Sequence, residues 1–266
     1  MKAIAGIDVG SQTTKAVIVG DNGTIIGRSH VPTKIDLGGA AERALEEACK
    51  SAGLTRSQLG YVAATGYGRF QVEFRDLQIT EMTCHAYGAH TVFPNTRSVL
   101  DIGAQNSRAM SIEPNGRVRK FRMNDKCAAG AGRFMERVAK ALEVELDQIG
   151  PLSLKATDPT PISSICAVLA ESEVINQVTE GKKVEDIICG AHYSITDRII
   201  ALLRQVGGEE EITLTGGVTK NVGMVKTLED RLGKKVNVGP DSEFMGAIGA
   251  ALLGLRRLQR VTATAA

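Results

Sequence analysis

The sequence predicts an α/β protein that consists of two related halves. Residues 99–120 repeat the pattern of residues 6–27 at a constant offset of 93 positions. Around the two copies, segments with helical spacing alternate with segments of strand-like spacing. Hydrophobic residues make up 43% of the 266-residue chain and charged residues 23%, a composition typical of a soluble globular protein with a sizeable core.

The repeated segment predicts the same three strands in each half. An apolar strand ends in Asp-x-Gly, a second strand follows, and an Asn-Gly hairpin turn leads to a third. Chance similarity between two hairpins is the alternative, because Asn-Gly turns are common, but several coincidences at one offset favour duplication. The matched pairs are Asp8 with Asp101, Gly10 with Gly103, Gln12 with Gln105, and Asn22-Gly23 with Asn115-Gly116.

The other elements follow from periodicity and from stop signals. In the first half we expect a helix that Gly53 ends, a strand that leads into Gly66-Tyr67-Gly68, and a helix that ends before Pro94. In the second half we expect helices, a strand that enters Gly216-Gly217, and further short elements. The predicted ranges are helices 39–52, 81–93, 128–142, 164–180, 186–206 and 221–232, a C-terminal helix from Phe244, and strands 60–65, 212–215 and 236–238.

The best boundary between the halves lies near residues 93–97. We expect a first lobe of residues 1–94 plus 243–266 and a second lobe of residues 95–242. The C-terminal helix is assigned to the first lobe because its Gly- and Ala-rich face suits close helix packing. The second lobe then carries the helices that follow two of the cysteines.

Composition argues against several classes of function. The formal charge of +2, the absence of Trp and an aromatic content of 4% give no basis for nucleic-acid binding. The longest apolar stretch, residues 244–255, is too short to span a bilayer, and the N-terminus enters a strand pattern at once instead of a signal peptide. We therefore expect a cytoplasmic protein with neither a nucleic-acid nor a membrane partner.

Cysteine usage argues against a disulfide framework. The chain has five cysteines, an odd number, at wide and irregular spacing and without a CxxC pair. Cys49, Cys84 and Cys189 lie in apolar helical patterns and are interpreted as core residues.

The segment of residues 8–15 has the properties of a phosphate-binding hairpin. Gly10 lets the backbone approach a ligand, and the amides and hydroxyls that follow can donate to phosphate oxygens. Asp8 and Asp101, one from each half, are expected to hold hydrated Mg²⁺, which takes few carboxylates, and Gln105 to orient the attacking water. The expected nucleotide-binding residues are Gly10, Ser11, Gln12, Thr13, Thr14, Lys15, Gly103, Ala104, Gly216, Gly217 and Val218.

Each of these pieces is a weak signal alone, since a strand-terminal Asp-x-Gly is more often a turn and Gly216-Gly217 more often a loop. Their order inside a duplicated frame favours a nucleotide site, with the strand end at residues 215–218 suited to an adenosine. The Walker A pattern and the Rossmann glycine pattern are both absent, which argues against a P-loop or dinucleotide fold.

The same segments carry a resemblance that covers nearly the whole chain. They are DVGSQTTK (8–15), ATGYGR (64–69), DIGAQ (101–105), NDKCAAGAGRF (124–134), ISSICAVLAESEVI (162–175) and LTGGVTKN (214–221). Their order resembles the ATPase superfamily of actin, Hsp70 and the sugar kinases. More narrowly, the chain resembles the activators of 2-hydroxyacyl-CoA dehydratases and the ATPase subunits of benzoyl-CoA reductases. The resemblance implies a duplicated fold of two lobes with the nucleotide cleft between them.

Two cysteines follow polar residues that predict helix caps. Asn124 or Asp125 places Cys127 in or beside the first turn of a helix, and Ser163-Ser164 does the same for Cys166. Such positions favour the thiolate and offer N–H donors to a negative group. Two buried structural cysteines are the alternative interpretation. The resemblance implies instead that Cys127 and Cys166 bind a [4Fe–4S] cluster, one per homodimer, with two ligands from each chain.

The resemblance also implies the activity. A reduced cluster transfers an electron uphill while ATP is hydrolysed to ADP, because the two nucleotides favour different angles between the halves. The implied partners are an acceptor iron–sulfur enzyme, such as a dehydratase or reductase, and a ferredoxin or flavodoxin as donor. One departure is visible: the family pattern Asp-Ile-Gly-Gly-Gln-Asp has Ala104 and Asn106 in this chain, which puts the hydrolysis rate and the identity of the acceptor in question.

Two other functions remain open at this stage. A small-molecule kinase of the same fold would use Asp101 as a base, although the chain lacks long insertions to build a substrate pocket and a kinase does not explain the cysteine pair. A nucleotide-dependent filament or scaffold protein would be colourless. An iron–sulfur protein purified without oxygen would be brown.

Overall fold

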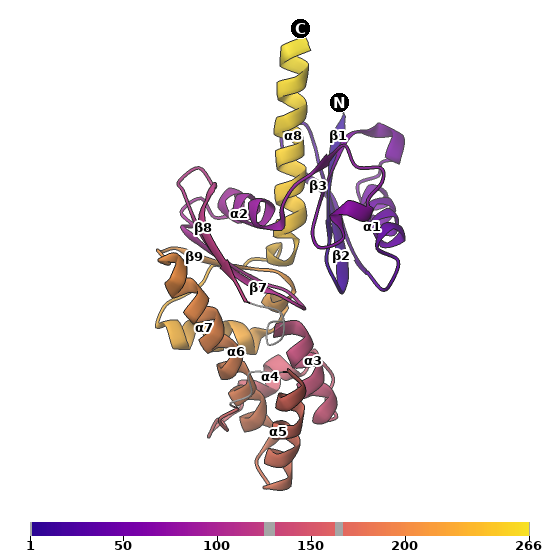
Figure 1. Ribbon diagram of the computed structural model, residues 1–266. Helices are drawn as coiled ribbons and strands as arrows, with labels where there is room; N and C mark the ends of the chain where they lie inside the picture. The colour runs from indigo at the N-terminus through magenta and orange to yellow at the C-terminus, as the bar shows by residue number, and fades with distance from the viewer. Residues whose placement is uncertain (1, 125–130, 163–166, 266) are drawn as a thin grey trace. The chain divides into compact units, whose positions relative to one another are not determined.

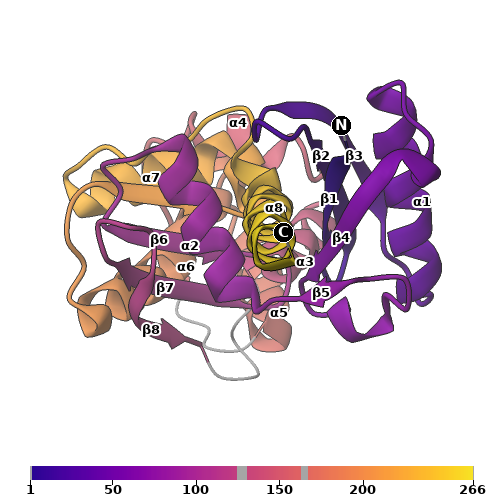
Figure 2. The same cartoon turned by 90° about the horizontal axis from the view of Figure 1, so that it is seen from above.

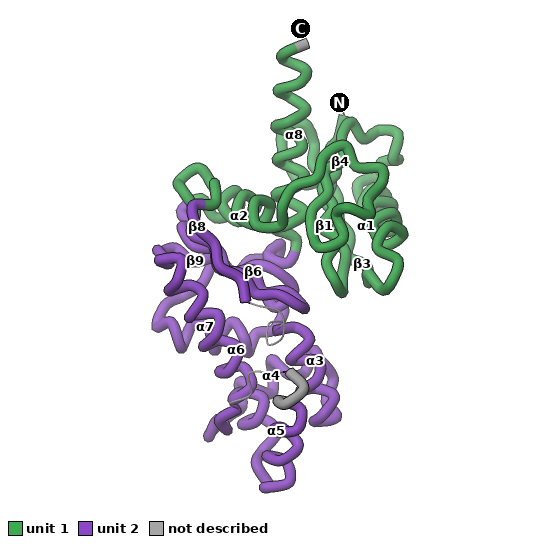
Figure 3. Tube along the Cα trace, viewed as in Figure 1, with its two compact units in different colours: residues 1–94, 112–118, 244–266 green, residues 95–111, 119–243 purple. Residues whose placement is uncertain are grey.

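The structure is a computed structural model that describes residues 2–124, 131–162 and 167–265. These residues divide into two compact units, shown in Figure 3. Unit 1 comprises Met1–Pro94, Ile112–Val118 and Phe244–Ala266, and unit 2 comprises Asn95–Ser111 and Arg119–Glu243. The tip of one hairpin, Ile112–Val118, thus groups with unit 1.

Unit 1 is built around a mixed sheet with the strand order β3-β2-β1-β4-β5. β1 pairs antiparallel with β2 and parallel with β4, so the first hairpin and the later strand flank the same central strand. The elements are β1 (Ala3–Val9), β2 (Thr13–Val19), β3 (Ile25–Pro32), α1 (Leu37–Ser51), β4 (Leu59–Thr65), β5 (Leu77–Gln78), α2 (Glu81–Val92) and α8 (Met245–Ala265).

Helices cover both faces of this sheet. β1 and β2 are buried along almost their whole length, as expected for a sheet that is covered on both sides. Ile7, Val9 and Ile18 form one core cluster with α1, while Ile4, Val17 and Val19 form another with the start of α8. Figure 2 shows α1 and α8 on opposite sides of the strands. Asp36 begins α1 by accepting a hydrogen bond from the Gly39 N–H (2.8 Å).

Unit 2 repeats this arrangement in a second sheet with the order β8-β7-β6-β9. β6 pairs antiparallel with β7 and parallel with β9, as β1 does with β2 and β4. The elements are β6 (Ser98–Ile102), β7 (Ser107–Ile112), β8 (Val118–Met123), α3 (Ala131–Ala141), α4 (Ile149–Ser153), α5 (Ala167–Thr179), α6 (Val184–Val206), β9 (Ile212–Thr215) and α7 (Val222–Leu232). Most of them are labelled in Figure 1, and β6 is labelled in Figure 3. The predicted duplication of an α/β half is confirmed.

The core of unit 2 lies between the sheet and its helices. Leu100 and Ile102 of β6 pack in one cluster with Phe134 of α3, Ile188 of α6 and Leu228 of α7. α6 is the longest helix described and ends at Gly207, whose φ of 70° is the left-handed C-terminal conformation that glycine adopts readily.

Two expectations about elements differ from the structure. The strand predicted at residues 236–238 is wrong: Asn237 alone makes a bridge, to Thr213, because the chain turns soon afterwards, at Gly239, whose carbonyl accepts a hydrogen bond from the Ser242 N–H. The short helix α4 was not predicted, since its Gly150 and Pro151 obscure the helical pattern; Pro151 lies in the first turn, where its missing N–H costs nothing.

Within the described ranges, no helix combines the length and the apolar character needed to span a bilayer. The starts of the helices predicted at 128–142 and 164–180 fall outside the described residues, as do Asp125, Ser163, Ser164 and both expected cluster ligands, Cys127 and Cys166.

Candidate functional site

The first half presents a tight loop between β1 and β2. A Cβ at Gly10 would lie 2.7 Å from the carbonyl oxygen of Thr13, so the loop closes in this form only with glycine. Behind it, Thr33 Oγ1 donates to the Gly10 carbonyl (2.8 Å) and shares a hydrogen bond with Thr14 Oγ1 (2.9 Å). The Thr14 hydroxyl, expected to contact phosphate, therefore makes a hydrogen bond that supports the loop. Ser11 and Gln12 lie at the tip of the loop and are half-buried.

A basic residue lies directly across the hairpin from Asp8. Asp8 and Lys15 are paired in the β1–β2 register, which puts both side chains on the same face of the sheet. Lys15 is buried, and its Nζ donates to Thr13 Oγ1 (2.6 Å). This ammonium group is thus held at the mouth of the loop, where an anion would gain from its charge.

Asp8 lies at a crowded junction of unit 1. His85 Nε2 of α2 lies 3.7 Å from Asp8 Oδ2, and both side chains are buried. A Cβ at Gly246, in the first turn of α8, would lie 2.5 Å from the same carboxylate oxygen. The N-terminus of α8 therefore approaches Asp8, and the partial positive charge of a helix N-terminus favours a carboxylate.

The second half places Asp101 at the equivalent strand end but gives it a different partner. Asp101 Oδ2 accepts a hydrogen bond from Arg108 Nη1 at 2.7 Å, and both side chains are almost fully buried. Arg108 is paired with Asp101 across β6 and β7, as Lys15 is with Asp8. On the other side, Thr215 Oγ1 of β9 donates to Asp101 Oδ1 at 3.5 Å.

In both halves the parallel strand ends in a threonine that a glycine follows. Asp8 is paired with Thr65 of β4, and Asp101 with Thr215 of β9. Gly66 and Gly216 come next, and both have a φ of 91°. A Cβ at Gly66 would lie 2.5 Å from Asp8 Oδ1, and one at Gly216 would lie 2.9 Å from Asp101 Oδ1. Each glycine thus leaves room for the carboxylate and adopts a conformation that other residues rarely take.

The second loop is bound to a helix. Gly103 N–H donates to the Asn106 carbonyl (2.9 Å) and closes the turn, while the side chain of Gln105 is exposed at its tip. The carbonyls of Gly103 and Ala104 in turn accept hydrogen bonds from the backbone N–H groups of Gly132 (3.2 Å) and Arg133 (3.1 Å), in the first turn of α3. α3 therefore begins on the predicted phosphate loop.

The predicted adenosine segment, residues 215–218, contains the left-handed Gly216. Its N–H donates to the Ser242 carbonyl (3.2 Å), whereas a Cβ at Gly217 would meet nothing within 4 Å. Gly217 therefore borders open space, which suits the approach of a flat ligand. Val218, by contrast, is buried and supports the turn.

A buried histidine anchors the end of this segment. Asn221 begins α7 by accepting from the Met224 N–H (3.0 Å), and its Nδ2 lies 3.1 Å from Nε2 of His192 in α6. His192 is fully buried, and burial lowers its pKa to about 3. The imidazole is therefore neutral at physiological pH and can accept the hydrogen bond from Asn221.

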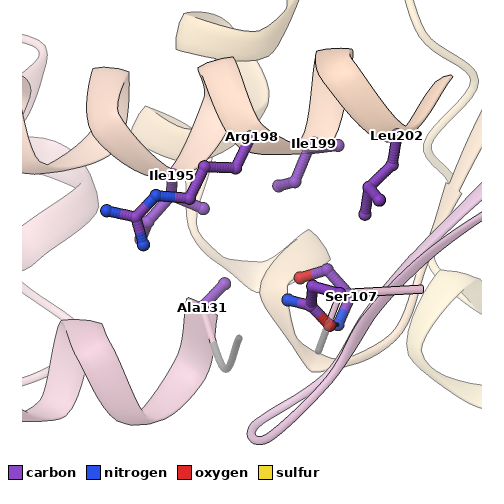
Figure 4. A pocket seen from close by; sticks show the side chains of 7 residues that line it. Ser107, Ala131, Ile195, Arg198, Ile199 and Leu202 are labelled. Carbon is purple, nitrogen blue, oxygen red and sulfur yellow. Dashed lines mark hydrogen bonds between the residues drawn. The ribbon is translucent and has the colours of Figure 1, made fainter. Parts of the chain in front are cut away.

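A small pocket lies between the start of β7, the end of β8, the start of α3 and one side of α6. It has room for about one water molecule and is lined by Ser107, Asn124, Ala131, Ile195, Arg198, Ile199 and Leu202. Figure 4 shows Arg198 reaching from α6 toward Ala131. Asn124, expected to cap the following helix, uses its Oδ1 to accept the Ser107 N–H (2.9 Å), and burial lowers the pKa of Arg198.

The three cysteines that the structure describes are buried thiols. Cys49, Cys84 and Cys189 are buried, as expected for core residues, and burial raises the pKa of each thiol, that of Cys84 to about 12. In the part of the chain that the structure describes, no group of three or more His, Cys, Asp or Glu residues could hold a metal ion.

Sequence reasoning missed several residues at these two strand ends. The fold brings to Asp8 four residues that are distant from it in the sequence: His85, Gly246, Thr65 and Gly66. Arg108 could have been found, because it follows Lys15 at the same offset of 93 that relates the two copies.

Comparison with known proteins identifies a family and several relatives. The model of the BadF/BadG/BcrA/BcrD ATPase family matches residues 5–254. The activator of lactoyl-CoA dehydratase from Anaerotignum propionicum is 42% identical over 96% of this chain and 98% of its own length. One of the subunits of benzoyl-CoA reductase from Thauera aromatica is 38% identical over 98% of this chain and 96% of its own length.

Solved structures agree with these relatives. The activator of the 2-hydroxyisocaproyl-CoA dehydratase from Clostridium difficile, solved with bound ADPNP, superposes with a TM-score of 0.92 at 35% identity, covering 98% of this chain and 97% of that one. A glucokinase of the ROK family from Streptomyces griseus superposes with a TM-score of 0.59 at 12% identity over 96% of this chain and 99% of that one. This second likeness concerns the fold alone, and the fold is of the predicted actin/Hsp70/sugar-kinase type.

Proposed function

Because the chain belongs to the BadF/BadG/BcrA/BcrD ATPase family, we propose that it uses ATP hydrolysis to drive low-potential electron transfer to a partner iron–sulfur enzyme. The observation that carries the proposal is the bond between a nucleotide loop and a helix. The first turn of α3 is held by the carbonyls of Gly103 and Ala104, and Cys127 precedes this helix by four residues. A shift of the loop on hydrolysis would therefore move the start of α3.

A second contact extends this route to the other cysteine. Arg137 of α3 lies 3.6 Å from Glu171 of α5, and Cys166 immediately precedes α5. α3 and α5 pack against each other and also contact α6. Both cysteine-bearing segments thus continue into helices that are in direct contact, so a shift of α3 would be passed to α5.

Cys127 and Cys166 are proposed as the cluster ligands. The other cysteines are buried thiols with raised pKa values, which does not suit thiolate ligation. A [4Fe–4S] cluster takes four thiolates, which two chains with two cysteines each supply in a homodimer. When bound, such a cluster accepts and releases one electron at a time.

At the nucleotide, Asp8 and Asp101 are proposed to hold the hydrated Mg²⁺, and Gln105 to orient the attacking water. Both carboxylates are the next-to-last residue of a first strand and lie beside a Thr-Gly turn, and the Gln105 side chain is exposed to solvent. Lys15 would place its positive charge beside the phosphates, since its Nζ is held at Thr13. Gly217 leaves space for the adenosine.

The names of the relatives support the class of partner. One relative activates lactoyl-CoA dehydratase and another is part of benzoyl-CoA reductase. We therefore propose an acceptor of the dehydratase or reductase class, with a ferredoxin or flavodoxin as electron donor in the cytoplasm.

Purification without oxygen tests the cluster. We expect a brown homodimer with about four iron atoms per pair of chains, and loss of iron and colour in Cys127→Ser and Cys166→Ser. Cys189→Ser is the matched control and should keep the iron, because Cys189 lies in the core of unit 2. A colourless protein with ATP-dependent phosphorylation of a small molecule would contradict the proposal and favour the kinase, and normal iron content in Cys127→Ser would contradict the ligand assignment.

A further inference from the structure

The strand β8 carries a concentration of positive charge. Four of the six residues 117–122 are Arg or Lys, although the whole chain has a formal charge of only +2. Two of these four lie beside glutamates. Lys120 and Arg122 make no ion pair in the parts of the chain that the structure describes, and the Arg122 guanidinium donates to the Phe121 carbonyl (3.0 Å). The charges of Lys120 and Arg122 are therefore available to a partner.

β8 is also exposed on both of its faces. It is the outer strand in the order β8-β7-β6-β9 and lies at the margin of this sheet in Figure 2. Successive side chains of a strand point to opposite faces, yet every residue from Arg119 to Met123 is exposed. Phe121 and Met123, which share one face, are each 42% exposed. The strand thus presents two large apolar side chains next to two positive charges.

Protection of a sheet edge explains only part of this composition. Positive side chains on an edge strand discourage the pairing of one sheet with another, and Lys120 and Arg122 suit that purpose. Phe121 and Met123 do not, because exposed apolar side chains on an edge favour association. A second copy of this chain is a poor occupant, since pairing along β8 would bring like charges together. A partner with an acidic surface fits both features.

The chain connects β8 directly to a proposed cluster ligand. Cys127 lies outside the described residues, but it follows Met123 by four positions, and four residues span at most about 14 Å. A partner bound to β8 would therefore lie near the proposed cluster. β8 belongs to a sheet, whereas α3 and α5 are the elements proposed to shift with the nucleotide. A surface on the sheet edge suits a partner that must bind in every nucleotide state, as an electron donor does.

We propose that residues 120–123 of β8 are the docking surface for the electron donor, a small redox protein with an acidic face such as a ferredoxin; the inference rests on the proposed function. Four thiolates give the cluster of a ferredoxin a net negative charge, which the positive strand complements. Lys120 and Arg122 attract and orient the donor, and Phe121 and Met123 exclude water from the contact. So small a surface matches weak redox encounters, which bury less than about 1,200 Å².

The first experiment measures the affinity of the full-length protein for a bacterial two-cluster ferredoxin by calorimetry without oxygen. Binding should weaken when the ionic strength rises from about 20 to about 200 mM, because the charges are exposed. The double variant Lys120→Glu/Arg122→Glu should bind at least about tenfold more weakly at the lower ionic strength. Arg257→Glu/Arg260→Glu makes the same change of charge at exposed positions of α8 and should bind like the unmodified protein.

Chemical cross-linking tests the position of the contact. A carbodiimide joins an amine to a carboxylate only where the two groups touch. We expect mass spectrometry of the digested complex to find Lys120 coupled to an acidic residue of the ferredoxin. Lys120→Arg keeps the positive charge, so it should keep the affinity and lose this cross-link.

Three results would overturn the inference. They are unchanged ferredoxin affinity in the double variant, a change of its oligomeric state on size exclusion, which would make β8 a contact between copies, and loss of electron delivery to an acceptor enzyme with intact ferredoxin binding, which would assign β8 to the acceptor. Affinity and cross-linking do not depend on a cluster in this chain. A colourless protein would therefore contradict the proposed function without deciding whether β8 binds the ferredoxin, so the two failures are distinguishable.

Discussion

At the scale of single residues, equivalent positions in the two halves have acquired different surroundings. Asp8 meets a histidine and a helix N-terminus, and Asp101 meets an arginine. A duplicated backbone frame fixes where each carboxylate lies, because strand pairing is set by main-chain hydrogen bonds. The side chains around each carboxylate come from other elements and can differ between the halves.

His192 provides a residue-scale prediction on pH and stability. The unfolded imidazole has its ordinary pKa of 6.5, and burial lowers the folded value to about 3. Between these values the unfolded chain binds more protons, so the free energy of unfolding should fall as the pH falls, by up to about 1.4 kcal/mol per pH unit from this group.

His192→Gln keeps a hydrogen-bonding partner for Asn221 and removes the titration. Urea unfolding at several pH values between about 6.5 and 4 should therefore show a shallower loss of stability in the variant than in the unmodified protein. Equal slopes would show that His192 is already accessible to protons in the folded state.

At the scale of elements, two helices of unit 1 cross at glycine. A Cβ at Gly249 of α8 would collide with the carbonyl oxygen of Cys84 in α2, and one at Gly88 of α2 would collide with the carbonyl oxygen of Met245. The two backbones therefore touch directly, and no larger residue fits at either position without moving a helix. The same crossing brings the start of α8 to Asp8.

Gly249→Ala should therefore destabilise the protein by about 1–3 kcal/mol despite the higher helix propensity of alanine. The matched control is Gly254→Ala on the same helix, where the new Cβ would come no closer than 3.1 Å to Ala63 and 3.3 Å to Ile4, so that much smaller adjustments are needed. Denaturant unfolding measures both. A Gly249→Ala protein as stable as the control would mean that α2 and α8 can separate at little cost.

The contact between α3 and the second loop is the other decisive feature at this scale. A Cβ at Gly132 would lie 2.8 Å from the Cα of Ala104, so this glycine allows the helix to start against the loop backbone. Ala104 is one of the departures from the family pattern. The methyl group of Ala104 fits against α3 because Gly132, the residue beside it, has no side chain.

At the scale of the whole molecule, the described residues form two units that share the order of four strands and have separate cores. Each unit has, as the next-to-last residue of its first strand, a carboxylate that we propose to contact the nucleotide. A nucleotide that binds only the folded chain stabilises it by mass action, in addition to the stability that each core provides.

Addition of ADP and Mg²⁺ should accordingly raise the midpoint of thermal unfolding, by a free energy of about 2.7 kcal/mol when free ligand exceeds the dissociation constant about a hundredfold. Asp101→Asn should need more nucleotide for the same rise. Asp197→Asn, which alters an exposed pair with Arg231 on the surface of unit 2, is the control and should respond like the unmodified protein. A rise that does not depend on Mg²⁺ would argue against carboxylate-held metal.

The sequence by itself determined the duplicated α/β frame, the strand ends at Asp8 and Asp101, and most helices to within a few residues. These features depend on local signals: alternation of apolar residues, Asn-Gly turns and glycine stops. The sequence predicted a strand at residues 236–238 that is wrong, because the extended run there is short. It did not predict α4, because Gly150 and Pro151 are untypical of helices.

Only the tertiary structure decided what surrounds the site. The sequence patterns do not predict the Asp101–Arg108 pair, the approach of His85 and Gly246 to Asp8, or the seating of α3 on Gly103 and Ala104. Of the residues in these contacts, only Arg108 is indicated by the sequence repeat, because it follows Lys15 at the offset of 93 positions. The reason is physical: these contacts join residues that are seven to more than two hundred positions apart, and their energies arise from burial, which no local pattern encodes.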